Sequence, residues 1–328
     1  MLSRDAEHLY WLSRYVERVE NTARLINVNS ELMLDFPGDK TLGWQSIIET
    51  LDNLDIYQRR YVTFKEANVI NFLCYEEANP NSIKNSLIKA AYNVKETRDY
   101  LPQSATEQVN NLLNEFNRGT LKARRGQPKD MYKLIEGSQR FFGIINDNFS
   151  TGLVFEFIRL GRYIERVDMI SRTLDTLCVS KKNSQTHDFS TLEWASMLRN
   201  LSAQGAYREE SKGEIERGSV LRFLFKNKGF PRSLNTCLRE IDKCVAVLPN
   251  NNLLKEEVYK VIERIMSSRV ENYDDDKLHT FLDNLQGKIS NLDQRIHKSW
   301  FQFHGYFRHS MRLKLLFLYF LQKVFFRA

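Results

Sequence analysis

Residues 9–27 read LYWLSRYVERVENTARLIN, and residues 159–175 repeat much of that stretch as RLGRYIERVDMISRTLD. When Tyr15 is aligned with Tyr163, the two stretches lie 148 residues apart. The aligned positions that carry identical residues are Leu12/Leu160, Arg14/Arg162, Tyr15/Tyr163, Glu17/Glu165, Arg18/Arg166, Val19/Val167 and Arg24/Arg172. In both stretches apolar residues recur at alternating spacings of three and four, which predicts two amphipathic helices that face a core.

The opposite face of each predicted helix is polar and rich in arginine. On the first helix it carries Tyr10, Arg14, Glu17, Asn21 and Arg24, with Arg18 at its edge, and on the second it carries Arg162, Glu165, Arg166 and Arg172. One interpretation is a solvent-exposed face, on which i,i+4 pairs such as Glu20–Arg24 contribute only ~0.2–0.5 kcal/mol each. The other is a packed or ligand-facing polar network. It is favoured because both stretches keep arginine, whose planar fork binds carboxylate or phosphate in a bidentate manner.

The second interpretation yields a set of candidate ligand-binding residues. The arginines would clamp carboxylates of a peptide or an amino acid, the acidic residues would orient them or accept an amine, and the tyrosines would line the pocket. The set comprises Arg14, Tyr15, Glu17, Arg18, Glu20, Asn21, Arg24, Arg162, Tyr163, Glu165, Arg166, Asp168 and Arg172. The sequence assigns no catalytic residue.

Other stretches repeat in the same order. Residues 41–51 (TLGWQSIIETL) match residues 191–201 (TLEWASMLRNL) at an offset of 150. Residues 69–87 match residues 220–238 at an offset of 151. Repeats in a constant order predict two similar helical units, each of which buries its apolar stripes within itself and against the other.

We therefore expect an all-α fold, a helical bundle of two internally duplicated repeats. Residues 1–150 form repeat one, residues 151–303 form repeat two in one compact unit with the first, and residues 304–328 form a tail. A pseudo-twofold pairing of the two arginine-rich helices would set their polar faces close together.

Turn signals predict where two helices of the first repeat end or begin. The first helix is predicted to run to about Leu34, because Phe36-Pro-Gly-Asp39 stops it. A later helix is predicted to begin at Pro80, since proline suits the first helical position, with Asn79 as its N-cap.

The composition is that of a soluble globular chain, with 42% apolar and 27% charged residues in 328. Only 14 Gly and 6 Pro occur, too few for a turn-dense β protein. The net charge of +7 permits an anionic partner. The basic residues are spread along the chain instead of forming a patch, so a nucleic-acid partner is not expected.

Cysteine and histidine give no metal site and no disulfide framework. The four cysteines contain no CxxC, and the six histidines show no paired-ligand spacing. Reduced, buried thiols and an N-terminus without an apolar segment predict a cytoplasmic protein.

The tail, residues 304–328, has no counterpart in the first half. Its apolar run from Leu315 to Leu321 is far shorter than the ~20 residues that a membrane span needs. Three alternatives remain for it: a helix docked in a partner or oligomer interface, packing against the core, or contact with an anionic membrane surface through its flanking basic residues.

Several common sequence signatures of phosphate binding and of catalysis are absent. No GxxxxGK[ST], GxGxxG or GxSxG occurs, and no cofactor is expected. An arginine next to a glutamate lowers the glutamate pKa, which makes it a poor general acid or base near neutral pH. The polar face therefore suits recognition better than turnover.

The opening MLSRDAEHLYWLSRYVERVENTARLINVN resembles the alpha-E family, an all-helical bacterial domain family of unknown function with a Glu-Arg motif. Further matching segments are EANVINFL (66–73), NPNSI (79–83), IRLGRYIERVDMISRTLD (158–175), LRNLSAQGAYR (198–208) and FPRSL (230–234). The resemblance extends to about residue 303 and places the motif at Glu17-Arg18 and Glu165-Arg166. Ser13 departs from it, because the family usually has glycine there, and the tail lies outside it.

The resemblance implies an accessory role beside an ATP-grasp-type ligase and a transglutaminase-like protein, in peptide ligation or modification. The first hypothesis is a non-catalytic binding protein that holds a peptide or amino-acid ligand on the Glu-Arg face. The alternatives are an enzyme that forms or transfers amide bonds through Glu17 or Glu165, and a scaffold in which the Glu-Arg network is purely structural.

Overall fold

The computed structural model describes residues 1–35, 40–118, 128–182, 190–211 and 213–302. Throughout these ranges every regular element is a helix, which confirms the predicted all-α class. The elements are α1 (Ser3–Asp35), α2 (Lys40–Thr50), α3 (Leu54–Gln58), α4 (Glu66–Cys74), α5 (Ile83–Glu96), α6 (Gln103–Asn117), α7 (Pro128–Asn148), α8 (Leu153–Lys182), α9 (Ser190–Asn200), α10 (Gln204–Ser211), α11 (Arg217–Lys226), α12 (Leu234–Val247), α13 (Asn252–Ser267), η2 (Val270–Asn272), α14 (Asp275–Ile296) and η3 (His297–Phe301).

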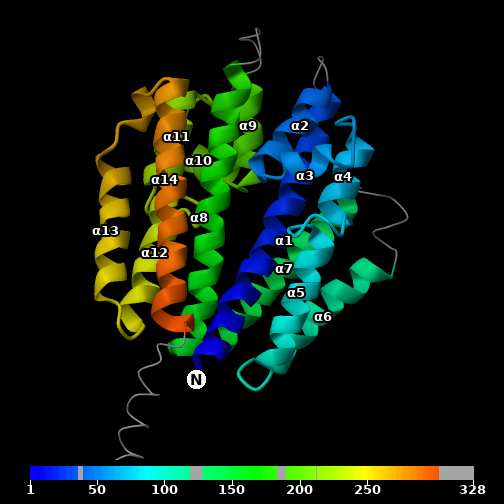
Figure 1. The fold of residues 1–328 in the computed structure, drawn as a ribbon. Helices are drawn as coiled ribbons and strands as arrows, with labels where there is room; N and C mark the ends of the chain where they lie inside the picture. The colour runs from blue at the N-terminus through cyan, green and yellow to red at the C-terminus, as the bar shows by residue number, and fades with distance from the viewer. Residues whose placement is uncertain (36–39, 119–127, 183–189, 212, 303–328) are drawn as a thin grey trace, which may run out of the picture.

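The two long helices α1 and α8 pack side by side in the middle of the molecule (Figure 1). Helices α5 and α7 pack on α1, and α12 and α14 pack on α8. The short helices α2 and α9 lie at the end of the molecule where α1 and α8 finish (Figure 1). The two arginine-rich stretches of the sequence therefore lie on the two central helices.

The apolar stripes form two clusters of buried side chains. One cluster combines the N-terminal half of α1, including Leu9 and Val16, with α8, the helices that follow it, and parts of α5, α6 and α7. The other gathers the C-terminal half of α1, including Ala23 and Ile26, with α2, α4 and part of α7. Helix α1 thus contributes to both parts of the core, because its apolar residues recur along its whole length.

Local capping chemistry sets the start of α5. The prediction that this helix begins at Pro80 is wrong: its first residue is Ile83, and the hydroxyl of Ser82 accepts a hydrogen bond from the backbone N–H of Asn85 at 3.3 Å. Asn79 instead accepts from the N–H of Asn81 at 3.0 Å, a turn that precedes the cap. The predicted end of the first helix near Leu34 is confirmed by α1. The predicted stop at residues 36–39 and the tail at 304–328 lie outside the described residues.

The four cysteines are free and buried, as predicted. Burial raises the pKa of both Cys74 and Cys237 to about 12, so neither thiol is a ready nucleophile. None of the helices in the described part of the chain has the length and apolar character to cross a membrane.

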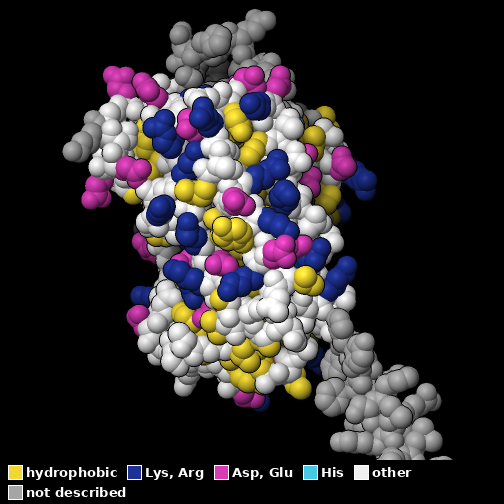
Figure 2. Space-filling view, turned by 90° about the vertical axis from the view of Figure 1, so that its left-hand side faces the viewer, with side chains coloured by type: hydrophobic (Ala, Val, Ile, Leu, Met, Phe, Trp, Pro, Cys, Tyr) yellow, Lys and Arg dark blue, Asp and Glu magenta, His cyan; other side chains and the backbone are white. Residues whose placement is uncertain are grey.

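In Figure 2 the Lys and Arg side chains lie mainly over the upper and middle part of the face, with Asp and Glu side chains and apolar side chains between them. On this face charges of both signs are interspersed. Within the described residues, a network of ion pairs lies inside the protein, between α1 and α8.

Candidate functional site

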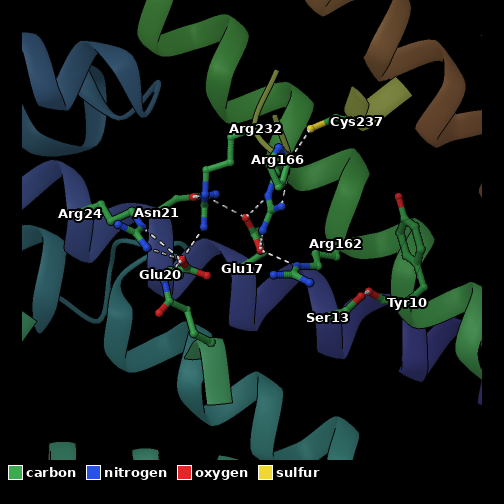
Figure 3. Close-up of polar contacts among 12 residues, drawn as sticks. Tyr10, Ser13, Glu17, Glu20, Asn21, Arg24, Arg162, Arg166, Arg232 and Cys237 are labelled. Atoms are coloured by element: carbon green, nitrogen blue, oxygen red, sulfur yellow. Dashed lines mark hydrogen bonds and ion pairs between the residues drawn. The ribbon is translucent and has the colours of Figure 1, made fainter. Parts of the chain in front are cut away.

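Glu17 of α1 is held by arginines of α8. Its carboxylate accepts two hydrogen bonds from Arg166, from Nε at 2.6 Å and from Nη2 at 2.8 Å, which is a bidentate pair. Arg162 adds a third bond from Nε at 3.2 Å. Arg166 and Arg162 lie one helical turn apart on α8 and converge on the same carboxylate (Figure 3).

Glu165 of α8 is held in the same way by arginines of α1. Its carboxylate accepts from Nε and Nη2 of Arg18, at 2.5 and 2.9 Å, and from Nε of Arg14 at 2.8 Å. Each helix therefore contributes one glutamate whose carboxylate is bound by arginines of the other helix. The polar faces of the two stretches meet, as a pseudo-twofold pairing requires.

The helices come close enough for this exchange because of Gly161. A Cβ atom at Gly161 would lie 2.2 Å from the carbonyl oxygen of Tyr10 and 2.3 Å from Oγ of Ser13. Ser13 is aligned with Gly161 in the two stretches, so the two aligned positions face each other at the helix crossing. Ser13 keeps its hydroxyl satisfied by donating to the Tyr10 carbonyl oxygen at 2.9 Å.

A family model described as a predicted alpha-helical domain with a conserved ER motif matches residues 1–301. The chain belongs to the Alpha-E family. No curated protein and no solved structure matches it. The Glu-Arg pairs Glu17-Arg18 and Glu165-Arg166 are the two ER dipeptides on the central helices, and each glutamate of one pair binds the arginine of the other.

The motif glutamates Glu17 and Glu165 and the arginines that bind them form a cluster, called here the Glu-Arg cluster, whose centre is buried. The interpretation of a solvent-exposed face is therefore wrong for the centre of this cluster. Glu17 and Glu20 have no exposed surface, and Arg166 and Glu165 are each 3% exposed. The side chains of Arg18 and Arg162 are partly exposed, and so is the pair of Asp168 and Arg172, joined at 3.0 Å, at the margin of the cluster.

A third carboxylate extends the cluster along α1. Oε1 of Glu20 accepts from Nη2 of Arg24 at 2.8 Å and also from Arg232. Arg232 reaches further to Oδ1 of Asn21, at 3.3 Å, and to Glu17. Because it binds both glutamates, Arg232 links the neighbouring acidic residues of α1 (Figure 3).

The tyrosines of the two stretches flank the cluster. The Arg18 guanidinium carbon lies 5.6 Å from the ring centre of Tyr15, and that of Arg166 lies 5.7 Å from the ring centre of Tyr163. Both rings are partly buried. Each tyrosine thus packs against the arginine of its own ER pair by a cation–π contact.

Two residues that bind members of the cluster, Arg232 and Asp293, were not predicted from the sequence. Arg232 precedes α12 and lies in the segment FPRSL, at the position that aligns with Asn81 at the offset of 151. Asn81 accepts a hydrogen bond from Arg18 at 2.7 Å, so this alignment is the signal in the sequence that could have indicated Arg232. Asp293 of α14 accepts from Nη1 of Arg14 at 2.8 Å and from the hydroxyl of Tyr10. No stretch of the first half marks Asp293, and its role follows from packing alone.

The arginines fix the charge state of the two motif glutamates. Burial alone would raise the pKa of Glu17, but the charges of Arg166, Arg232 and Arg162 lower it to about 2. Burial likewise opposes ionisation of Glu165, and Arg18 and Arg14 lower its pKa to about 2. Both carboxylates are therefore ionised near neutral pH.

The cluster holds more arginine than acid. Burial and the neighbouring charge of Arg166 lower the pKa of Arg232 to about 10. Desolvation also lowers the pKa of Arg162, next to Arg166.

Within the described residues no three His, Cys, Asp or Glu side chains are grouped so that they could hold a metal ion.

Proposed function

We propose that this Alpha-E protein is a non-catalytic helical accessory protein in which the two ER motifs hold α1 and α8 together. The observation that carries the proposal is the reciprocal bidentate pairing of Glu17 with Arg166 and of Glu165 with Arg18. A bidentate pair uses the face of the guanidinium that would otherwise bind a substrate carboxylate.

The pairing argues against a direct ligand clamp on these arginines. A ligand carboxylate would have to displace a buried glutamate, and a buried charge that loses its partner costs several kcal/mol, roughly 3–5. Such a ligand would need to supply at least that much binding energy before it gained anything. Clamping by Arg14, Arg18, Arg162 or Arg166 is therefore the less favoured role.

An enzyme that uses Glu17 or Glu165 as general acid or base is also less favoured. With a pKa of about 2, each carboxylate is a weak base near neutral pH and carries no proton to donate. Their lone pairs already accept arginine hydrogen bonds. These facts support a structural role for the motif and a recognition role for the protein.

We further propose that residues 1–150 and 151–303 are two duplicated units that exchange contacts across the central helix pair. Nη1 of Arg24 in α1 donates to Oγ of Ser202 after α9, at 2.6 Å. The aligned Arg172 in α8 lies 3.8 Å from Oδ2 of Asp52 after α2. Asp52 and Ser202 are aligned positions, and both have a positive φ, of 53° and 52°. The equivalence of these contacts supports the duplication.

More aligned pairs share a role. Ser82 caps α5 and Ser233 caps α12 through the same side-chain-to-backbone hydrogen bond. Tyr57 and Tyr207 are buried, and each donates its hydroxyl to a backbone carbonyl six or seven residues further on. If the units are equivalent, Arg18→Ala and Arg166→Ala should lower the free energy of unfolding by similar amounts.

The partners in this proposal come from the family resemblance: an ATP-grasp-type ligase and a transglutaminase-like protein in a peptide-ligating or peptide-modifying system of the cytoplasm. The accessory role is supported by the state of the two motif glutamates, which are buried, ionised and paired with arginine and are therefore poor catalytic groups. A tagged full-length chain, co-expressed with an ATP-grasp-type ligase and a transglutaminase-like protein of the same organism, should co-purify with at least one of them. Failure to co-purify with either would overturn the partnership.

The role of the motif is tested by thermal unfolding of the wild type and of Arg18→Ala, each with and without short peptides, free amino acids and ATP. A structural motif predicts that Arg18→Ala melts earlier, and that any ligand that raises the wild-type midpoint raises the variant midpoint as well. A ligand that raises only the wild-type midpoint would instead place the binding site on the Glu-Arg face.

A further inference from the structure

Asp168 of α8 is aligned with Glu20 of α1 at the offset of 148, but the two carboxylates have different surroundings. Three side chains donate hydrogen bonds to Glu20: Arg24, Arg232 and Gln139. Within the described residues, the carboxylate of Asp168 accepts a hydrogen bond from Arg172 alone, through Oδ2 at 3.0 Å. Glu20 has no exposed surface, whereas the side chain of Asp168 is 24% exposed. The aligned acid of α8 therefore keeps an oxygen, Oδ1, that is open to solvent.

The first difference is the residue that stands in the place of Arg232. Figure 3 shows the guanidinium of Arg232 between the carboxylates of Glu17 and Glu20, and it donates to both. Asn81 aligns with Arg232 at the offset of 151, and both residues lie in the turn that leads into the next helix. The asparagine side chain is much shorter than that of arginine. It therefore cannot place a cation beside the aligned carboxylates of α8.

The second difference is the side chain that covers the acid from the neighbouring helix. The offset of 151 also aligns buried apolar positions of α7 with buried positions of α14: Met131/Leu282, Phe141/Leu292 and Ile145/Ile296. Gln139, which donates to Glu20 at 3.3 Å, then aligns with Ser290. A serine hydroxyl reaches less far than a glutamine amide, and Asp168 is itself one methylene shorter than Glu20. Three shorter side chains thus surround the place that corresponds to the head group of Arg232.

The balance of charge beside Asp168 favours a cation. Among the described residues, ion pairs on one side of the central helix pair join four arginines to two carboxylates: Arg24, Arg162, Arg166 and Arg232 to Glu17 and Glu20. On the other side they join three arginines to four carboxylates: Arg14, Arg18 and Arg172 to Glu165, Asp168, Asp293 and Asp52. A fourth guanidinium on this second side would meet more acid than Arg232 meets on the first.

The ionisation of Asp168 agrees with this balance. Burial raises the pKa of Asp168, and the charge of Arg172 only partly offsets that effect. The arginines around Glu17 and Glu165 instead lower the pKa of each to about 2. A further cation beside Asp168 would stabilise its ionised form.

We propose that Asp168 is the centre of a binding site for a guanidinium group, of the class of a peptide's arginine side chain, in the place that Arg232 occupies in the other half. The guanidinium donates to Oδ1 of Asp168, and the buried charge of Glu165 adds to the attraction. A charge-assisted hydrogen bond of this kind is stronger than a neutral one. The choice of a peptide as the source of the guanidinium rests on the proposed role in peptide ligation or modification. The site itself rests on the comparison of the two halves.

The test is direct binding to the full-length protein, followed through Met169. This residue aligns with Asn21, whose Oδ1 accepts a hydrogen bond from Arg232 at 3.3 Å. Its methyl signal, in protein whose methionines carry 13C at the methyl group, is assigned with Met169→Leu. The probes are N-acetyl-argininamide and its uncharged isostere N-acetyl-citrullinamide. We expect the arginine compound to shift the Met169 signal in a saturable way, and the citrulline compound to bind at least tenfold more weakly.

Three variants separate the site from the fold. Asp168→Asn should bind N-acetyl-argininamide at least tenfold more weakly, while its melting temperature changes little because the pair with Arg172 is partly exposed. Asp168→Glu, which keeps the charge, should retain binding. Asn81→Arg supplies the missing guanidinium from the chain itself, so it should abolish binding of the probe and raise the melting temperature.

Three results would overturn the proposal. They are the absence of a saturable shift in the wild type, equal affinity for the two probes, and undiminished binding in folded Asn81→Arg. This readout does not depend on co-purification with the ligase or the transglutaminase-like protein. The guanidinium site and the proposed partnership can therefore fail independently.

Discussion

Gly161 of α8 lies against Ser13 of α1 so closely that a Cβ atom on the glycine would be 2.3 Å from the serine Oγ and 2.2 Å from the Tyr10 carbonyl oxygen. The Tyr10 carbonyl oxygen belongs to the backbone, so it cannot rotate away from an added Cβ atom as the end of a flexible side chain could. Any residue larger than glycine at position 161 must push α1 and α8 apart. The Glu-Arg pairs join the same two helices, so their hydrogen bonds would lengthen as well.

The first prediction is that Gly161→Ala destabilises the protein by about 3 kcal/mol, the upper range for overpacking a closely packed interior. Urea unfolding monitored by far-UV circular dichroism measures it. The control is Gly287→Ala in α14, where no atom lies within 4 Å of the added Cβ. That variant should gain roughly 0.5–1 kcal/mol, because alanine is the better helix former. Equal effects of the two substitutions would contradict the close crossing.

The second prediction concerns the buried ion pairs. Arg166→Ala leaves Glu17 without its bidentate partner in a site with no exposed surface, so we expect a loss of about 3–5 kcal/mol. A double-mutant cycle with Glu17→Ala should show strong coupling, since the two side chains share two hydrogen bonds.

The control for this pair is Lys260→Ala on α13. Lys260 and Glu256 form an i,i+4 ion pair at 2.6 Å, but both side chains are more than 60% exposed. Solvent screens such a pair, so its loss should leave the midpoint of unfolding nearly unchanged. A large effect at Lys260 or a small one at Arg166 would show that burial does not set the strength of these pairs.

The sequence predicts the central helices well because their evidence is local and repeated. Apolar spacings of three and four predict both helices. The aligned Arg18 and Arg166 indicate that the two polar faces use their arginines in the same way. Periodicity cannot tell whether a polar face meets water or another polar face. Burial of Glu17 depends on α8, whose residues lie about 150 positions away.

The members that sequence analysis misses come from outside the repeated stretch. Arg232 lies in a turn, where no helical period applies, and its binding to Glu20 depends on how that turn packs on α1. Asp293 lies on a long amphipathic helix among other acidic residues, and only the approach of Arg14 distinguishes it. The predicted start of α5 at Pro80 is wrong for a local reason. Ser82 is the better cap, so the helix begins at Ile83, and the preceding asparagine forms a turn.

The third prediction is loss of stability in acid. The pKa values of Glu17 and Glu165 are lowered from 4.5 to about 2 in the folded protein, so both groups stabilise the fold above about pH 4.5. That contribution is lost as the pH falls from about 4.5 to 2, and the difference corresponds to roughly 3 kcal/mol per carboxylate. The free energy of urea unfolding should fall steeply over this range.

Glu17→Gln tests the assignment of this slope. The variant is less stable at pH 7, where the charge it lacks is most stabilising, and its stability should depend less on pH between 5 and 2 than that of the wild type. Glu256→Gln, in solvent on α13, should keep nearly the wild-type slope. A wild-type slope in Glu17→Gln would assign acid unfolding to other carboxylates.

The last prediction uses the two aligned helix ends at Asp52 and Ser202, which share a left-handed backbone but differ in what their side chains hold. Asp52→Gly relieves the positive φ of 53° and gives up only a 3.8 Å contact of an 87% exposed side chain with Arg172, so it should stabilise the protein by about 0.5–1 kcal/mol. Ser202→Gly relieves a similar φ of 52° but removes the hydroxyl that accepts from buried Arg24, which costs about 1–3 kcal/mol. We therefore expect substitutions of the same kind at aligned positions to have opposite signs in urea unfolding. If both glycines stabilise, the Arg24 contact with Ser202 contributes little, and the exchange of contacts between the two halves depends on the ER pairs alone.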